Sequence, residues 1–446
     1  MSTINSVVKR NGTIVAFNPD RITNAIYRAA VEMGGRDRSI AEGLSHQVVQ
    51  ILEAQTPPDH IPTVEEIQDI VEKVLIENGH AKVAKAYILY RAERARLRRR
   101  HQEQMPRNSP NIPWAKLWNA LDWAVDHGVN TIAGLNARIA QGEFANLVHE
   151  AEAMYGEDIK HASDLILERR HELKVVIITG PSSSGKTTTT IKVGERLKQA
   201  GINLVTLNVD NYYFPLEVHP KDEFGDYDFE TPQALDLALI SQHLARLISG
   251  EEVLIPFYDF KSGQRYDDRT PLKLGANDFL LIDSLHGLYP TMTQDVPDER
   301  KFKLYLEPLL QMKDDAGEYV HWTDLRLIRR MLRDAVHRGY DPRQTLVHWH
   351  YVRSSEIRHI IPHTHEADYI VNTGMPYELP IYAARMLDQF AHWVEEFRND
   401  PLRGDAFHRA SRVHALLSQV TPVHDDSSIP PDSVLREFIG GSVYKY

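Results

Sequence analysis

The apolar positions of the first hundred residues follow a helical period. After Pro19 they return every three or four positions, which places them on one face of a helix: Ile22, Ala25, Ile26, Ala29 and Ala30. Asn18 is a suitable N-cap, and Pro19 suits a first helical turn. A further helix is predicted after Thr63, because Glu66 follows three positions later as in a capping box. We therefore predict a helix-rich domain over residues 1–95.

The next segment is polar at first and then helical again. Residues 101–114, "HQEQMPRNSPNIPW", are rich in proline and polar side chains and read as a linker. The helical period returns in residues 142–170. We assign residues 96–172 to a linker and helical segment.

From residue 173 the pattern changes to short apolar runs separated by helical stretches. The runs are "KVVIIT", "NLVTLNV", "DFLLIDS", "KFKLYLE" and "ADYIVNT", and they are spaced widely enough for a helix between most neighbours. This spacing predicts an α/β domain over residues 173–400, with a parallel sheet and helices on both faces. A hairpin is predicted around the turn "KSG" at 261–263. Residues 401–446 are expected to pack on this domain as a C-terminal extension.

Composition narrows the class of protein. A net charge of −11 argues against a general nucleic-acid or acidic-membrane binder. The chain has no cysteine, which excludes disulfides and zinc–thiolate sites and fits a reducing compartment. No apolar stretch approaches the length of a membrane span, and the first residues lack the apolar core of a signal peptide. We expect a cytoplasmic protein without membrane or nucleic-acid partners.

The strongest motif is "GPSSSGKTT" at residues 180–188, which follows one apolar run and opens a helical stretch. It fits the pattern G-x-x-x-x-G-K-[ST], in which backbone N–H groups hold nucleotide phosphates, the lysine reaches the outer phosphates and the hydroxyl binds Mg²⁺. The predicted nucleotide-binding residues are Gly180, Pro181, Ser182, Ser183, Ser184, Gly185, Lys186, Thr187 and Thr188. The motif by itself predicts a bound nucleotide with Mg²⁺.

Two aspartates end predicted strands at the edge where α/β proteins bind ligands. Asp210 follows the second strand and could accept a hydroxyl proton during attack on the outer phosphate. Asp283 ends the third strand and could serve as a Mg²⁺ ligand beside Thr187. The alternative for both aspartates is a local turn or cap.

A helical stretch near residue 330 is rich in arginine. Arg326, Arg330 and Arg333 fall within one helical face, with Arg329 beside them. Cations there would stabilise the charge of a moving phosphoryl group, so the helix could be a lid. A solvated charged face is the alternative. The predicted hairpin carries Tyr258 and Arg265, which could contact substrate or be ordinary surface.

Taken in order, these segments resemble the uridine kinase/phosphoribulokinase family of small-molecule kinases. The resemblance rests on the phosphate loop, "VDNYY", "YDFETPQALD", "PFYDF", the strand ending at Asp283, and "DLRLIRRMLRD". It implies a P-loop sheet with the strand order of nucleotide monophosphate kinases. It also implies that Asp210 is the general base, that Lys186 and Thr187 hold ATP and Mg²⁺, that Arg330 lies on the lid, and that Tyr213, Glu230 and Tyr258 bind substrate. Beside the resemblance, the hairpin, the arginine-rich helix and the position after the predicted lid add Arg265, Arg326 and His348 as candidates for substrate binding.

The chain departs from that family at the acceptor side. Glu230 stands where typical uridine kinases have an aspartate for the ribose hydroxyls, and Gly263 stands where they have a base-contacting histidine. Tyr340 replaces a lid arginine, and Asp283 replaces a glutamate. Loss of a base-reading side chain weakens discrimination strongly, so the acceptor is left open.

From about residue 115 to the end, the chain is similar to multidomain uridine kinase-like nucleoside kinases, through "GPSSSGKTT", "EADYIVNTGMPYELPIY" and "SVLREFIGGS". Residues 4–95 resemble an ATP-cone, the nucleotide-sensing domain of ribonucleotide reductases, through "VVKRNGTIVAFNPDRITNAI". This resemblance implies allosteric binding of ATP or dATP by Lys9, Arg10, Gly12, Arg21, Ile22 and Thr63. A plain helical domain is the alternative.

Two other patterns are assigned no site. Six arginines lie between Arg91 and Arg100, where a helix dipole favours cations without any nucleic acid. Five histidines lie between His348 and His365, but Pro362 interrupts the spacing that metal ligation would need.

The sequence thus predicts an ATP- and Mg²⁺-dependent kinase that phosphorylates a hydroxyl of a small molecule, foremost a nucleoside, under control by ATP or dATP. A sugar-phosphate kinase and a nucleotide-sensing regulator with a non-catalytic kinase fold are the alternatives. We expect a homo-oligomer.

Overall fold

The computed structural model describes residues 4–8, 14–33, 35, 37–57, 60–88, 111–220, 227, 229–400 and 403–445. The chain divides into two compact units, of which the first comprises residues 1–109 with two short segments, 221–227 and 399–402. The remaining residues from Pro110 to Tyr446 form the second unit. None of the described helices is long and apolar enough to cross a membrane.

The N-terminal unit is a hairpin followed by helices. Strands β1 (Ser6–Val8) and β2 (Ile14–Ala16) pair antiparallel. Helices α1 (Asp20–Glu32), α2 (Arg38–Gln55) and α3 (Val64–Glu77) bury one apolar face each around residues such as Ile26, Val48 and Val71. The predicted capping box at Thr63 and Glu66 is confirmed.

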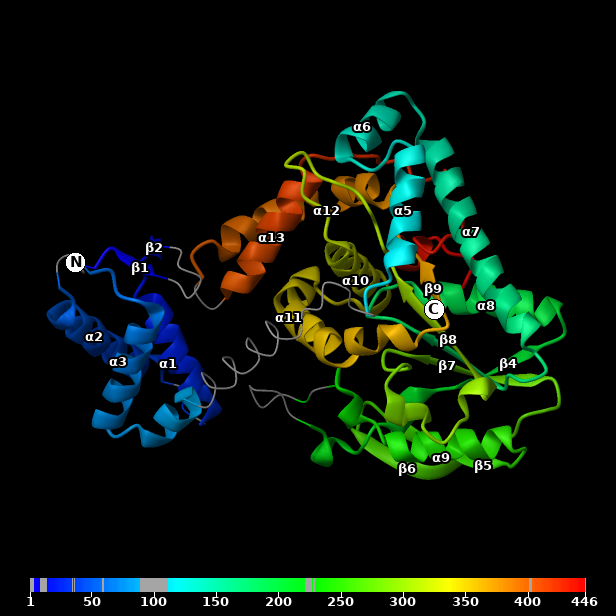
Figure 1. The fold of residues 1–446 in the computed structure, drawn as a ribbon, viewed down its shortest axis with the longest axis horizontal. Coiled ribbons are helices and arrows are strands. Elements are labelled where there is room, and N and C mark those ends of the chain that lie inside the picture. Colours follow the sequence, from blue (N-terminus) through cyan, green and yellow to red (C-terminus); the bar gives the residue numbers. More distant parts are fainter. Residues whose placement is uncertain are drawn as a thin grey trace. The chain divides into compact units, whose positions relative to one another are not determined.

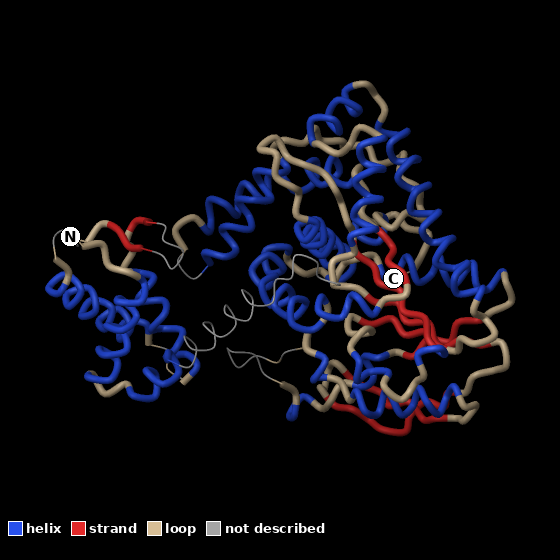
Figure 2. Tube along the Cα trace, viewed as in Figure 1, coloured by secondary structure: helices blue, strands red, loops and turns tan. Residues whose placement is uncertain are grey.

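The second unit is built on a five-stranded parallel sheet (Figures 1 and 2). Its strands are β3 (Val175–Thr179), β4 (Asn203–Leu207), β7 (Asp278–Ser284), β8 (Lys301–Glu307) and β9 (Tyr369–Asn372). They lie in the order β4-β7-β3-β8-β9, so the predicted parallel sheet and the five apolar runs are confirmed.

Successive side chains of β3 point to opposite faces of the sheet, so the strand contributes to two hydrophobic cores. Val176 and Ile178 face the larger core, which includes α7 (Phe144–Glu168) and α8 (Lys186–Gln199). Val175 and Ile177 face the opposite core, which includes α9 (Leu237–Ile248). Because strand side chains alternate, a strand buried on both faces is apolar at every position, as the sequence of β3 shows.

The remaining helices complete the larger core or its rim. They are α5 (Trp114–Asp126), α6 (Ile132–Ala140), α10 (Trp322–Arg338), α11 (Pro342–His359), α12 (Glu378–Phe397), α13 (Gly404–Leu417) and α14 (Arg436–Ile439). Short 3₁₀ turns are η1 (Val209–Tyr212), η2 (Leu216–Val218), η3 (Pro232–Ala234), η4 (Pro290–Thr293), η5 (Asp298–Arg300) and η6 (Ile361–Glu366).

A hairpin separate from the central sheet is formed by β5 (Val253–Asp259) and β6 (Gln264–Leu272), as predicted (Figure 2). Gly263 closes its turn with φ +68°, and a Cβ there would lie 2.9 Å from Leu216. Both constraints exclude an ordinary side chain. Gly263 is therefore required by the backbone of this turn and by the closeness of Leu216.

The C-terminal segment belongs to the larger core. Its fully or nearly fully buried apolar side chains are Ile429, Val434, Leu435, Phe438 and Ile439. Burying each such side chain is worth about 1.5–3 kcal/mol. The segment is therefore held firmly against the sheet domain.

Candidate active site

The phosphate loop joins the end of β3 to the start of α8. Gly180 and Gly185 stand where larger residues do not fit: a Cβ at Gly180 would lie 2.4 Å from the carbonyl oxygen of Leu306, and one at Gly185 would lie 2.6 Å from Val434. Gly185 also has φ +87° as the N-cap of α8. The two glycines of the motif are thus required by their surroundings.

The loop presents hydroxyls that lack an internal partner. The Oγ atoms of Ser183 and Ser184 are buried, and no described residue bonds them. Ser183 also adopts φ +59°, which is rare for a non-glycine residue. Buried unpaired donors cost about 1–3 kcal/mol each, and strained backbone concentrates at functional sites. Both observations fit a loop built to bind an anion.

Lys186 lies across the same loop. Its Nζ donates to the carbonyl oxygens of Gly180 at 2.9 Å and Pro181 at 3.1 Å. Burial lowers the pKa of Lys186, and the Asp283 carboxylate opposes this shift. Thr188, two residues on, donates its N–H and hydroxyl to Glu437 of α14.

Asp283 and Asp210 lie at the carboxyl edge of the sheet, on β7 and just after the neighbouring β4. Burial raises the pKa of Asp283 to about 6, Lys186 opposes the shift, and the charges of Glu437 and Asp210 add to it. The backbone N–H of Asp210 is held by Asn208 Oδ1 at 3.0 Å, which leaves its exposed carboxylate beyond the strand.

The hydroxyl of Thr187 and the carboxylate of Asp283 are oxygen donors of the kind that Mg²⁺ prefers. In the part of the chain that the structure describes, no group of three or more acidic or histidine side chains could hold a metal ion alone. Nucleotide phosphates would therefore have to supply further ligands, as is usual for Mg²⁺ in kinases. The residues present fit that role.

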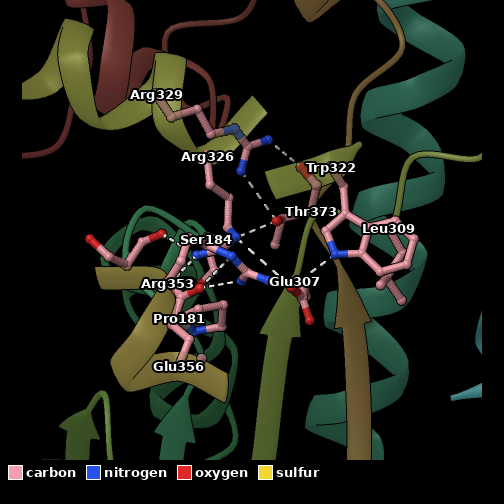
Figure 3. Close-up of polar contacts among 12 residues, drawn as sticks. Pro181, Ser184, Glu307, Leu309, Trp322, Arg326, Arg329, Arg353, Glu356 and Thr373 are labelled. Atoms are coloured by element: carbon pink, nitrogen blue, oxygen red, sulfur yellow. Dashed lines mark hydrogen bonds and ion pairs between the residues drawn. The ribbon is translucent and has the colours of Figure 1, made fainter. Parts of the chain in front are cut away.

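The arginines of α10 divide into two kinds. Arg326 and Arg329 are fully buried and tie the helix to the sheet domain (Figure 3). Arg326 Nη2 donates to Glu356 at 2.8 Å and Arg326 Nη1 to the carbonyl oxygen of Ser182 at 3.1 Å. Arg329 donates to Glu378 at 2.8 Å and to the carbonyl oxygen of Thr373. The guanidinium of Arg326, predicted to bind substrate, is instead committed to these anchoring contacts.

Arg330 is the arginine that reaches the mouth of the loop. Its Nη1 lies 3.1 Å from Ser182 Oγ and 3.3 Å from a carboxylate oxygen of Glu230. Arg333 pairs with Asp334 at 3.2 Å on the same helix. Arg326 and Arg330 thus both contact Ser182 of the phosphate loop, and Arg330 also contacts Glu230, a predicted substrate residue.

The carbonyl oxygen of Glu230 accepts two hydrogen bonds that the sequence did not suggest. One comes from Ser355 Oγ of α11, and the other comes from His286 Nε2 at 3.0 Å. Burial lowers the pKa of His286 to about 3, with His359 as the next cause, so its imidazole is neutral near pH 7. The sequence feature that could have identified His286 as a site residue is its position, three residues after Asp283 at the carboxyl edge of the sheet.

Aromatic rings gather around Tyr213, which was predicted to bind substrate. Tyr213 lies 5.6 Å from Tyr258 and from Phe229, and 5.9 Å from Phe260, between ring centroids. Tyr258 is buried, whereas Phe260 is exposed. Flat rings of this kind can pack against a base or another apolar body.

Two residues that were predicted to bind substrate are engaged in local ion pairs or hydrogen bonds. Arg265 pairs with Asp236 at 3.0 Å and with Asp267 at 2.9 Å. His348 is exposed on α11, and its Nδ1 lies 2.9 Å from the carbonyl oxygen of Gln344 of the same helix. Within the described residues, neither side chain contacts the phosphate loop.

The predicted allosteric residues fall partly outside the described residues, namely Lys9, Arg10 and Gly12. Arg21 is exposed in the first turn of α1. Ile22 is buried in the N-terminal core, and Thr63 caps α3. Of the described members, Arg21 alone carries a cationic side chain.

Comparison with known proteins gives two family matches. Residues 5–96 match the model of the ATP cone domain, and residues 175–379 match that of the phosphoribulokinase/uridine kinase family. The uridine kinase of Bacillus pumilus is 30% identical over 201 residues, covering 45% of this chain and 86% of the relative.

Uridine-cytidine kinase B of Dictyostelium discoideum is 28% identical over 201 residues, covering 45% of this chain and 74% of the relative. A solved structure of a possible uridine kinase from Bacillus stearothermophilus aligns with 48% of this chain and 98% of its own, at 15% identity and a TM-score of 0.31.

Proposed function

Since the chain belongs to the phosphoribulokinase/uridine kinase family, we propose that it transfers the outer phosphoryl group of ATP to a hydroxyl of a nucleoside. The observation that carries this proposal is the contact of Arg330 with both Ser182 of the phosphate loop and Glu230 of the acceptor side. A cation at that junction can stabilise charge on a phosphoryl group in transit.

Different residues of the chain have different roles in the proposed phosphoryl transfer. The phosphate loop holds the phosphates of ATP, and Lys186 supplies positive charge to the outer ones. Asp210 takes the proton of the acceptor hydroxyl as its oxygen attacks phosphorus. Glu230 and the rings of Tyr213 and Tyr258 orient the acceptor. Thr187 and Asp283 would hold Mg²⁺, which would supply positive charge against the phosphates of ATP.

The N-terminal unit would act as the sensor. Its match to the ATP cone domain supports a second site for ATP or dATP, for which Arg21 is the described candidate cation. Binding there would change the activity of the kinase unit or the assembly of a homo-oligomer.

The experiment that tests the function is a screen of acceptors with the full chain. Uridine, cytidine, purine nucleosides and pentose phosphates are offered with ATP and Mg²⁺, and formation of ADP and phosphorylated acceptor is measured. Turnover of a nucleoside is the expected result. Turnover of pentose phosphates alone would replace the nucleoside by a sugar phosphate. Absence of turnover with every acceptor, together with ATP- or dATP-dependent assembly, would make the protein a regulator.

A further inference from the structure

A carboxylate from the C-terminal segment is bonded inside the predicted nucleotide site. Glu437 Oε2 accepts the backbone N–H of Thr188 at 3.2 Å and the Thr188 hydroxyl at 2.8 Å. Both residues are buried. Glu437 lies well beyond residue 379, where the kinase family match ends. The contact therefore comes from a part of the chain outside the matched kinase domain.

The bonded atoms belong to the set that phosphates use. Gly185 is the N-cap of α8, so Thr188 is its third helical residue. The first amides of a helix have no acceptor within the helix, and in phosphate loops they hold the nucleotide. An N–H carries one proton, so the amide of Thr188 can serve Glu437 or a phosphate oxygen. The same holds for the hydroxyl proton.

The charge of Glu437 also contributes to the pKa shifts of Asp283 and Lys186. Burial is the largest cause of the raised pKa of Asp283, and Glu437 adds to it. Burial lowers the pKa of Lys186, and Glu437 opposes that shift. A negative charge thus lies among the groups that would receive the negative phosphates of ATP.

The segment that carries Glu437 is fixed. Val434 packs on Gly185, and Phe438 lies under Arg329 with 5.0 Å from the guanidinium carbon to the ring centroid. Arg436 donates to the carbonyl oxygens of Asp426 and Ile429 at 2.7 and 2.9 Å. Removing the segment would expose several core side chains, so we expect only the carboxylate to move.

We propose that Glu437 is an internal competitor of the nucleotide, whose carboxylate holds the phosphate donors of Thr188 and must release them when ATP binds. This inference rests on the proposed binding of ATP by the phosphate loop. Glu437 then lowers the affinity of the donor site, and its side chain sets the ATP concentration at which the kinase unit works.

The test is Glu437→Gln in the full chain. Glutamine keeps the size and an acceptor oxygen but removes the charge. Binding of ATP with Mg²⁺ is measured by calorimetry. ATP bound at the phosphate loop is distinguished from ATP bound elsewhere because Lys186→Ala abolishes it. We expect Glu437→Gln to lower the Kd of ATP at the phosphate loop at least fivefold.

The matched control is Asp432→Asn. It removes one charge from the same segment, but Asp432 pairs with Lys192 at 2.7 Å, and no contact joins it to Thr188. Its ATP affinity should stay within twofold of the wild-type value. Glu437→Asp supplies a second variant, because a shorter side chain keeps the charge and withdraws the acceptor from Thr188; it should also tighten ATP binding.

The measurements distinguish failure of the competitor role from failure of the proposed function. Equal or weaker ATP binding by folded Glu437→Gln and Glu437→Asp proteins would overturn the competitor role and make Glu437 a cap of α8. Equal tightening in Asp432→Asn would also overturn it, in favour of a general charge effect. Absence of any Lys186-dependent ATP binding by the wild type would instead overturn the proposed function.

Discussion

Arg330 Nη1 lies 3.3 Å from a carboxylate oxygen of Glu230, and this pair joins helix α10 to the segment that precedes η3. The side chains of Arg330 and Glu230 are 22% and 26% exposed to solvent, respectively. Ion pairs at such sites are worth about 0–1 kcal/mol. The pair can therefore exchange its partners for substrate groups at little cost, unlike the buried pairs of Arg326 and Arg329.

Arg330→Ala should lower kcat by about 10²–10³-fold, because it removes a donor aimed at the moving phosphoryl group. The Kd of ATP should change less, since Lys186 and the loop amides remain. Steady-state kinetics and calorimetry measure the two quantities. Arg343→Ala removes an arginine that pairs with Glu396 on the surface, and it should leave kcat unchanged. A normal kcat in Arg330→Ala would exclude a role in transfer.

Asp210→Asn should lower kcat by about 10²–10⁴-fold, the usual contribution of a general base. Binding of ATP should survive, because the substitution leaves the phosphate loop intact. Asp278→Asn is a matched control at the opposite end of β7, where the carboxylate caps a turn at Gly275. If Asp210→Asn turned over its acceptor at a rate near that of Asp278→Asn, Asp210 would not be the base.

Arg329→Met should destabilise the second unit by about 3–5 kcal/mol, because it leaves the buried carboxylate of Glu378 without its charge partner. Denaturant unfolding followed by tryptophan fluorescence measures the loss. Arg398→Met breaks a pair with Glu395 on the surface and should cost about 0–1 kcal/mol. A similar small cost in both variants would contradict the anchoring role of Arg329.

His286 should make stability depend on pH. Its folded pKa of about 3 lies below the ordinary 6.5, so the unfolded chain binds the proton more readily. Its contribution is fully present above pH 6.5 and is lost as pH falls toward 3. Between pH 6.5 and 5 the loss is up to about 2 kcal/mol.

The measurement is urea unfolding of wild type and His286→Gln at both pH values. Glutamine can still donate to the carbonyl oxygen of Glu230 but does not titrate. The wild type should lose more stability than the variant on acidification. Parallel losses in the two proteins would show that His286 is protonated in the folded state as readily as in the unfolded state.

The N-terminal unit should account for a second nucleotide. If residues 5–96 bind ATP or dATP, Lys186→Ala should leave one binding event per chain, and Arg21→Ala should weaken that event. Equilibrium dialysis with labelled dATP measures both. Arg28→Ala removes another exposed arginine of α1 and serves as control. Loss of all binding in Lys186→Ala alone would argue against a second site.

The local elements were predictable because their causes are local. Thr63 and Glu66 form a capping box within four residues, and the continuous apolar run of β3 reflects burial on both faces. The phosphate loop could be predicted in the same way, since its glycines, lysine and threonine stand at fixed spacing on one strand–helix junction.

The roles of the arginines on α10 could not be read from spacing. Arg326, Arg329 and Arg330 are nearly adjacent in sequence, yet their partners differ. Arg326 and Arg329 are buried and bond Glu356 and Glu378, respectively, whereas Arg330 contacts Glu230. Their partners lie 30, 49 and 100 positions away along the chain. Helical periodicity specifies a face, but which carboxylate meets that face depends on the packing of distant segments.

Local patterns in the sequence were therefore enough to predict the parallel sheet, the phosphate loop and the kinase family. Tertiary structure alone decided that His286 holds the backbone of Glu230 and that Glu437 bonds Thr188. The physical reason is range: caps, periods and loop motifs act over a few residues, whereas a hydrogen bond between Thr188 and Glu437 exists only after the core has brought together segments 249 positions apart.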